Sequence, residues 1–210
     1  MKVVLISDTH NQLDRVDIPE GDLLIYAGDF TNRGTYSEML KQINILGAHV
    51  SKFKKVVAIC GNHDFLGERD PAGTAQMFRE NNITYLDNNE TYFEGLKIYG
   101  SPWTPCFGGW AFNGRPEKLE RLWSQIPNDT DILVTHGPPH EILDLVLEGE
   151  RVGDPILRNR ISQLNQLKLH VFGHLHLQGG TFQEGTPIYA NAAICDDDYN
   201  PTRKAIVIEL

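Results

Sequence analysis

Five short runs of Val, Ile and Leu, each followed at once by Asp, Asn, His or Gly, restrict the fold of this sequence more than any other feature. The runs span residues 2–7, 22–27, 55–60, 131–135 and 169–172. They lack clean alternation of apolar and polar residues, which is typical of strands buried on both faces. Because such strands need helices around them, the runs favour an α/β protein.

Three segments between these runs have helical spacing of apolar residues. They cover residues 37 to about 52, 115–126, and about 155–167. In the last of them, Asp154 and Pro155 have the residue types of an N-cap and a first helical turn. The segment between His10 and Asp22 leaves little room for a full helix.

A second group of predicted strands is of antiparallel type and covers residues 91–93, 96–101, 180–182, 187–190 and 205–209. Gly95 and Gly185 lie in tight connections within this group. We therefore expect a pair of packed sheets with helices outside. Since no repeat, low-complexity tract or long linker interrupts the chain, we predict one domain over residues 1–210.

Polar residues with metal-binding chemistry follow the end of every buried run. They are Asp8 and His10, Asp29, Asn62 with His63 and Asp64, His136, and His174 with His176. Ligands of open α/β sheets bind in the crevice beyond the carboxyl ends of the strands. A single histidine there would be read as an ordinary turn or core residue, but five of the eight histidines fall in these positions. The repetition favours one common site over a coincidence of turn residues.

The residue types indicate which cations this site would bind. Carboxylate, amide and imidazole donors suit Mn, Fe, Zn, Co or Ni, and no cysteine belongs to the set. The seven candidate ligands exceed what one tetrahedral site uses and are enough for two metals that share a carboxylate, ~3.5–4 Å apart, as in phosphoryl chemistry. They are Asp8, His10, Asp29, Asn62, His136, His174 and His176. We expect a two-metal hydrolase.

The order of these motifs from residue 8 to residue 176 resembles that of the calcineurin-like metallophosphoesterases. The resemblance implies a four-layer αββα sandwich of two mixed sheets flanked by helices. It also implies that Asp8, His10 and His176 bind one metal, that Asn62, His136 and His174 bind the other, and that Asp29 bridges them. In this pattern His63 is not a ligand but an acid or transition-state stabiliser beside the leaving group, and Asp64 orients His63.

Three further segments resemble one branch of that family, the metallophosphoesterase-domain-containing or class III phosphodiesterase-like proteins. They are residues 31–34, 101–105 and 110–113. Asn32 stands where the protein-phosphatase branch carries aspartate, which argues against a Ser/Thr protein phosphatase.

The resemblance implies hydrolysis of phosphodiesters of small nucleotides or organic phosphates, by a hydroxide that bridges two divalent cations. Mn²⁺ is the expected metal, and Fe, Zn, Co and Ni stay open. A phosphomonoesterase or nucleotide pyrophosphatase is the nearest alternative, and a non-catalytic interaction module on the same fold is the alternative of another class.

The candidates for substrate contact are Arg33, Trp103, Trp110 and Asn113. The aromatic residues of segment 103–112 could stack on a nucleobase or aryl group, or could pack as an ordinary loop on the sheet. Similarly, residues 196–198, three consecutive aspartates, could form a solvated turn or repel polyanions near the site.

Charge and cysteine usage exclude several other classes. With 19 Lys and Arg against 28 Asp and Glu, the net charge is −9, which opposes a broad nucleic-acid surface and leaves a small phosphate ester as the expected partner. Apolar runs are too short to span a bilayer, and the first residues do not have a secretory pattern. Cys60, Cys106 and Cys195 lack the spacing of a disulfide framework or metal knuckle. We expect a cytoplasmic protein; its oligomeric state is left open.

Overall fold

The computed structural model describes residues 1–147 and 149–210, and two mixed sheets form its centre. The first sheet has the strand order β13-β1-β2-β3-β4, and the second has the order β11-β12-β10-β9-β6-β5. The first consists of β13 (Ile206–Glu209), β1 (Lys2–Ile6), β2 (Leu23–Ala27), β3 (Lys55–Ile59) and β4 (Thr84–Tyr85). The second consists of β11 (Gly180–Gln183), β12 (Ile188–Asn191), β10 (Leu169–Phe172), β9 (Ile132–Thr135), β6 (Leu96–Ser101) and β5 (Asn89–Phe93). A short pair, β7 (Thr104–Pro105) and β8 (Asn113–Gly114), lies apart from both.

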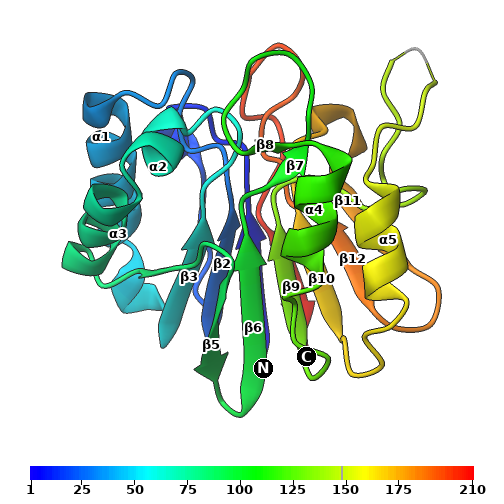
Figure 1. Cartoon of the computed structure of the whole chain (residues 1–210). Helices are drawn as coiled ribbons and strands as arrows, with labels where there is room; N and C mark the ends of the chain where they lie inside the picture. Colours follow the sequence, from blue (N-terminus) through cyan, green and yellow to red (C-terminus); the bar gives the residue numbers. More distant parts are fainter. Residues whose placement is uncertain (148) are drawn as a thin grey trace.

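The strands predicted to be of antiparallel type are divided between the two mixed sheets, and each has an antiparallel neighbour. In the first sheet only β13 is antiparallel to its neighbour, and it pairs with β1 from the far end of the chain. In the second sheet β12, β10, β9 and β6 run parallel, and β11 and β5 are antiparallel edges. Both sheets therefore have a parallel centre whose carboxyl ends point the same way (Figure 1).

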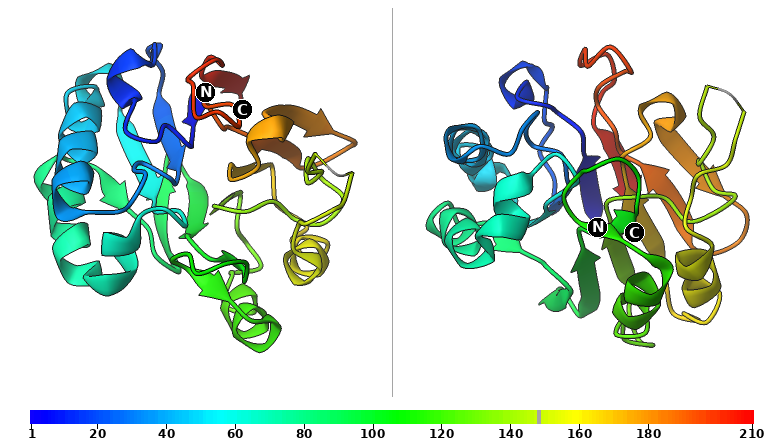
Figure 2. Two further views of the ribbon diagram at one scale, coloured as in Figure 1. Left: turned by 90° about the horizontal axis from the view of Figure 1, so that it is seen from above. Right: turned by 45° about the horizontal axis from the view of Figure 1, so that its top comes forward.

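Helices cover the outer faces of the two sheets and complete the predicted αββα sandwich. Helices α1 (Tyr36–Gly47) and α3 (Pro71–Glu80) lie against the first sheet, with the short α2 (Phe65–Arg69) leading into α3. Helices α4 (Pro116–Trp123) and α5 (Pro155–Ile161) lie against the second sheet (Figure 2). Within residues 1–147 and 149–210, no helix combines the length and the apolar character needed to cross a membrane.

All three predicted helices are present but shorter than predicted. Helix α1 ends at Gly47, and a separate 3-10 turn, η2 (Val50–Lys52), follows it. Helix α5 ends at Ile161, although Leu164 and Leu167 are buried in the turns beyond it. Apolar residues after a helix thus pack on the core without continuing the helix. Helices α2 and α3 lie in a part of the chain where no helix was predicted, whereas residues 10–22 contain one 3-10 turn, η1 (Leu13–Arg15), as expected.

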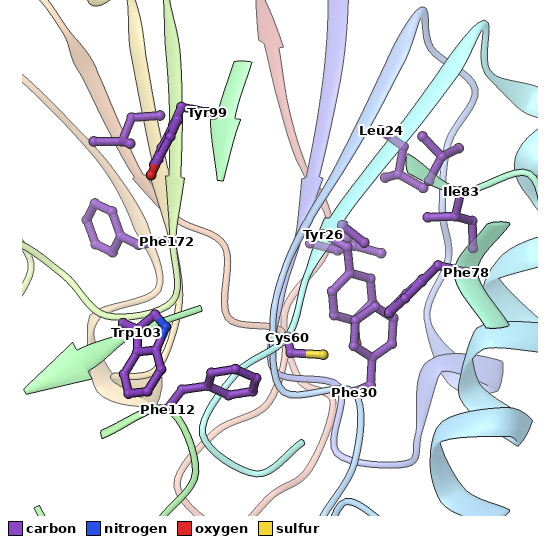
Figure 3. Packing of buried hydrophobic residues seen from close by; sticks show 14 of the residues in the cluster. Leu24, Tyr26, Phe30, Cys60, Phe78, Ile83, Tyr99, Trp103, Phe112 and Phe172 are labelled. Carbon is purple, nitrogen blue, oxygen red and sulfur yellow. The ribbon is translucent and has the colours of Figure 1, made fainter. Parts of the chain in front are cut away.

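Two kinds of apolar packing hold the layers together. Aliphatic residues such as Val3, Ile25 and Val134 fill the space between the sheets. On the outer face of the first sheet, aromatic rings pack among aliphatic side chains such as Leu24 and Ile83, and the rings of Tyr26 and Phe30 are stacked with their centroids 3.7 Å apart (Figure 3). Because the central strands are buried on both faces, their ends form a rigid support for the loops that follow.

Candidate metal centre

The loops that follow β1, β2, β3, β9 and β10 meet at one end of the molecule, where the two sheets adjoin (Figures 1 and 2). Asp8, Asp29 and Asn62 are all at most 2% exposed there, although they come from three different strand ends. The predicted convergence of strand ends is therefore what the structure shows.

Several of these residues have strained backbones. Asp8, His10, Asp29 and His174 have φ angles of 53°, 42°, 58° and 71°, in the left-handed region that non-glycine residues rarely adopt. Backbone hydrogen bonds hold this conformation, with Asp8 N donating to Gly28 O at 2.9 Å and Thr9 N donating to Asp29 O at 3.1 Å. Such strain is concentrated at functional sites, where the surrounding structure over-determines it.

Two glycines permit the close packing of these loops. A Cβ on Gly173 would overlap the carboxylate of Asp8, and one on Gly28, which has φ of 97°, would lie 2.6 Å from Nδ1 of His136. No side chain fits at either position, so the glycines let the acidic and imidazole groups approach the neighbouring loop.

Four histidines share one hydrogen-bonding pattern. Their Nδ1 atoms each lie 2.9–3.1 Å from a backbone carbonyl oxygen, in the pairs His10–Thr31, His63–Asn32, His136–Ala27 and His176–Asp196. A carbonyl oxygen can only accept, so Nδ1 carries the hydrogen, and in the neutral ring the lone pair is on Nε2. Ring orientation by a carbonyl at the other nitrogen is typical of metal-binding histidines.

The Nε2 atoms face carboxylates and one another. His176 Nε2 lies 3.5 Å from Asp8 Oδ1, and His136 Nε2 lies 3.3 Å from Asp29 Oδ2. His10 Nε2 lies between the two acids, 4.0 Å from Asp8 and 3.8 Å from Asp29. Ligand atoms within 4.8 Å of one another form three groups that could hold a metal ion: Asp8 with His10 and His176, Asp8 with Asp29 and His136, and His10 with Asp29 and His63.

The electrostatics of the cluster are those of a cation site. Burial opposes the charge of His136, yet Asp29 and Asp8 outweigh it and raise the pKa of His136 to about 9. Burial also acts against the charge of Asp29, but His136 and the neighbouring imidazoles lower the pKa of that carboxyl. His10, by contrast, has a pKa lowered to about 4, chiefly by burial. Buried carboxylates need positive charge beside them, which a proton on His136 or a bound cation can supply, so the donor set fits divalent cations.

Asn62 and His174, two predicted ligands, lie beside these groups. Asn62 Oδ1 is 2.8 Å from Nε2 of His136, so the amide oxygen faces the same space. The ring of His174 lies 5.1 Å from that of His136, and its backbone N–H donates to the Asp8 carboxylate at 3.0 Å. The structure therefore brings together all seven predicted ligands, with the His174 imidazole outside the three compact groups.

Asp64 has a different position from the one expected. Nδ1 of His63 lies 2.9 Å from Asn32 O, while the buried Asp64 carboxylate accepts from the backbone N–H of Gly61 at 2.9 Å and from the Thr31 hydroxyl at 2.8 Å. The Asp64 carboxylate makes no hydrogen bond to the His63 ring, so the predicted orienting role is left to an indirect route. Asp64 instead joins the loops after β2 and β3, and so sets the position of the segment that carries His63.

Only one of the four predicted substrate residues borders the site. Trp110 packs against His63, with 4.0 Å between ring centroids, and lines a cavity of about 630 Å³ that includes Asp29, Asn62 and His176. Trp103 is buried against Phe112, with the Lys118 ammonium over its ring. Asn113 bonds to the backbone of its own loop, accepting from Phe107 N and donating to Ala111 O. Arg33 is exposed and does not line the cavity.

Sequence reasoning missed Tyr199, whose ring lies edge-on to those of His10 and His176 at 4.6 and 5.4 Å. It follows the three aspartates of residues 196–198, of which Asp196 forms the expected turn by accepting from the N–H groups of Asp198 and Asn200. The backbone oxygen of Asp196 also accepts from His176. An aromatic residue after an acidic turn is too common a pattern to mark a site.

The fold and the cluster together define a metal-binding phosphoesterase architecture, and comparison with known proteins places the chain in a family. A sequence profile of the calcineurin-like phosphoesterases matches residues 1–178. The chain belongs to that family, whose members bind divalent metal ions.

Relatives and a solved structure agree with this assignment. The chain is 39% identical to human metallophosphoesterase domain-containing protein 1 over 233 residues, which cover 100% of this chain and 71% of the relative. It is 38% identical to UPF0046 protein K07C11.7 of Caenorhabditis elegans, with 93% of this chain and 70% of the relative covered. The crystal structure of TT1561 from Thermus thermophilus has the same fold, with a TM-score of 0.60, 15% identity, and coverage of 90% of this chain and 88% of that one.

Proposed function

We propose that this protein is a metal-dependent phosphodiesterase that hydrolyses small organic or nucleotide diesters with two divalent cations, Mn²⁺ being the favoured ion. The observation that carries the proposal is the convergence of oriented Nε2 atoms and buried carboxylates at the ends of five strands in a chain of the calcineurin-like family. Oxygen and imidazole donors without a thiolate suit Mn²⁺.

The arrangement supports a division of the ligands between two sites. Asp8, His10 and His176 would hold one cation, Asn62, His136 and His174 would hold the other, and Asp29 would lie between them. When bound, such a pair supplies activation of water near neutral pH and neutralisation of phosphate charge. Burial of Asp8 and Asp29 excludes bulk solvent from the ligands and strengthens this electrostatic effect.

His63 is the residue of this chain that we propose to act on the leaving group. It is 8% exposed, borders the cavity and lies in ring contact with His10 at 4.7 Å. Because Nδ1–H of His63 donates to Asn32 O, Nε2 faces the cavity, and the imidazolium form of the ring, which carries a proton on Nε2 as well, would give a hydrogen bond or proton to the departing oxygen. Asp64 is a positioning residue that acts through Thr31 and the loop backbone.

The charge of the cavity wall supports a diester over a monoester or a pyrophosphate. Among the described lining residues there is no Lys or Arg, and Asp197 adds a carboxylate. A diester carries one negative charge, whereas the alternatives carry two or more and are usually paired with basic side chains. The three cysteines, all free thiols, support the proposal of a cytoplasmic location.

The test is the initial rate on bis(p-nitrophenyl) phosphate and on p-nitrophenyl phosphate, with metal-stripped protein and increasing Mn²⁺. We expect hydrolysis that rises with Mn²⁺ and favours the diester. A preference for the monoester would overturn the diester assignment but not the proposal of a metal-dependent phosphoesterase. Two bound Mn²⁺ ions with no turnover of either ester would point to a non-catalytic protein.

A further inference from the structure

The cavity beside the metal-ligand cluster has an apolar side. Leu145, Val146, Leu147 and Val152 come from one loop, and Leu177 follows directly after His176. Phe107 and Trp110 complete this side, with the Phe107 ring 5.0 Å from that of His174. The apolar side and the ligand cluster line one space, so a single small molecule can touch both.

Exposed apolar side chains are concentrated at this cavity. Of the nine large hydrophobic residues that are exposed among those described, five line it: Phe107, Leu147, Val152, Leu177 and Tyr199. Leu147 is 77% exposed, and Val152 and Leu177 are both 41% exposed. A gathering of exposed apolar groups that borders a polar cluster is the usual form of a ligand site.

The loop that supplies most of the apolar side is held in place by a buried carboxylate. Asp144 is fully buried and accepts from Arg151 Nη1 at 2.6 Å, from Glu141 N at 2.9 Å and from Gly153 N at 3.3 Å. Val152 N also donates to Asp144 O at 3.1 Å. The guanidinium of Arg151 is therefore engaged at the base of the loop, and the cavity side of the loop stays uncharged at Val152 and Leu147.

We infer that this apolar side, named here the arm site, binds an uncharged apolar or aromatic ester group of the substrate. The inference rests on the proposed function, because it assigns the group attached to a phosphate at the metal centre. A cavity of about 630 Å³ holds a phosphate with room for a ring-sized group. An anionic arm would lie against Leu147, Val152 and Leu177, would meet no Lys or Arg among the described lining residues, and would lose hydration there. The arm site thus selects diesters with an alkyl or aryl arm over those with an anionic arm.

The first experiment compares p-nitrophenyl diesters that share one leaving group and differ only in the other arm. The arms are methyl, phenyl and 4-carboxybutyl, and the enzyme is loaded with Mn²⁺. We expect kcat/KM for the phenyl ester to exceed that for the methyl ester by about tenfold or more, the scale of an apolar group in a fitted pocket. Equal values for methyl and phenyl arms would overturn the inference.

Two substitutions at Val152 test whether the arm site causes the preference for phenyl over methyl arms. Val152→Lys should lower the preference for phenyl over methyl and raise kcat/KM for the carboxybutyl ester about three- to fivefold, as expected of a partly exposed ion pair. Val152→Thr, which keeps the shape of the side chain, should lower the preference for phenyl over methyl and leave kcat/KM for the carboxybutyl ester unchanged. The control is Val207→Lys, since Val207 is 44% exposed on β13 and does not line the cavity. Identical effects of the two lysine variants would overturn the inference.

Binding of non-hydrolysable anions separates this inference from the proposed function. Calorimetry of the Mn²⁺-loaded protein with phenylphosphonate and methylphosphonate should show tighter binding of the phenyl compound by about tenfold. If no diester is hydrolysed, the proposed function fails, while a phenyl preference in binding still supports the arm site. Equal binding of the two phosphonates, or no detectable binding of either, would overturn it.

Discussion

The Nε2 atoms of His10 and His176 lie 3.1 Å apart, although 166 positions separate the two residues in the chain. The Nδ1 atom of each ring lies at a backbone oxygen, of Thr31 and of Asp196 respectively. In the neutral rings two lone pairs would therefore face each other, which is unfavourable unless a proton or a cation lies between them. This contact between two residues far apart in the chain is the clearest geometric indication of a cation site.

Loss of His176 should remove one metal ion. We expect His176→Gln to lower the Mn²⁺ content from about two to about one per chain. The affinity for the lost ion should fall by more than the 10–100-fold that is typical when a residue hydrogen-bonded to a metal ligand is replaced. Elemental analysis after dialysis at fixed Mn²⁺ measures this. His49→Gln is the control, since His49 lies outside the three ligand groups. Unchanged metal content in His176→Gln would contradict the assignment of His176 as a ligand.

Loss of His63 should slow the reaction and leave the metals bound. We expect His63→Ala to lower kcat about 10²-fold or more, as removal of a general acid does, with two Mn²⁺ ions retained. The decrease should be smaller on esters whose leaving group is a weak base, because such groups need less protonation. A uniform decrease across leaving groups, or full activity, would remove His63 from the role of acid.

The link between Thr31 and Asp64 should contribute to stability more than to chemistry. Thr31→Val keeps the shape but removes the hydroxyl that donates to Asp64 at 2.8 Å. We expect the free energy of unfolding to fall by about 1–3 kcal/mol, because the variant leaves a buried carboxylate with one donor fewer and the Gly34 N–H without its acceptor. Urea unfolding measures it, and Thr181→Val on exposed β11 is the control. A variant that unfolds like the control would show that this hydrogen bond has little energetic weight.

His170 should make the protein less stable in mild acid. Burial lowers the pKa of His170 to about 3, against 6.5 in the unfolded chain, so the unfolded state binds the proton first. The stability that depends on neutral His170 is fully present above pH 6.5 and decreases as pH falls from 6.5 toward 3. Between pH 7 and pH 5 the free energy of unfolding should fall by about 2 kcal/mol for this reason.

The variant His170→Gln tests this pH dependence. Its side chain can still bond to the Thr135 hydroxyl, which lies 2.8 Å from Nε2 of His170, but it does not titrate. The decrease in unfolding free energy from pH 7 to pH 5 should be smaller than in the wild type by that amount, with no difference in slope between pH 7 and pH 8. Parallel curves over the whole range would contradict the prediction.

The Asp, Asn and His residues of the site were predictable because each follows a strand at a fixed position. Val, Ile and Leu runs determine the strands, and the parallel strand ends bring residues such as Asp8 and His136 to one place whatever the exact helix ends. The helix ends were less predictable. Leu164 and Leu167 continue the apolar spacing of α5 but lie in turns, since burial can be met without helical hydrogen bonds.

The local sequence pattern did not predict the contacts between distant loops. Asp64 was expected to orient His63, its neighbour in the sequence. The Asp64 carboxylate accepts hydrogen bonds from Thr31 and Gly61, whereas the His63 imidazole is bonded to Asn32 O. Likewise Trp103 and Trp110 belong to one aromatic segment, and only the second reaches the cavity. Side-chain direction in a loop depends on what packs against it, and spacing along the chain does not contain that information.

The amino-acid sequence by itself determined the α/β class, the strand ends and the donor set, because these depend on short-range pattern and residue chemistry. Only the tertiary structure decided which strands share a sheet, which carbonyl orients each imidazole, and that Leu147, Val152 and Leu177 line the same cavity as the ligands. These features depend on contacts between residues far apart in the chain, which are set by the packing of the two sheets and their loops as a whole.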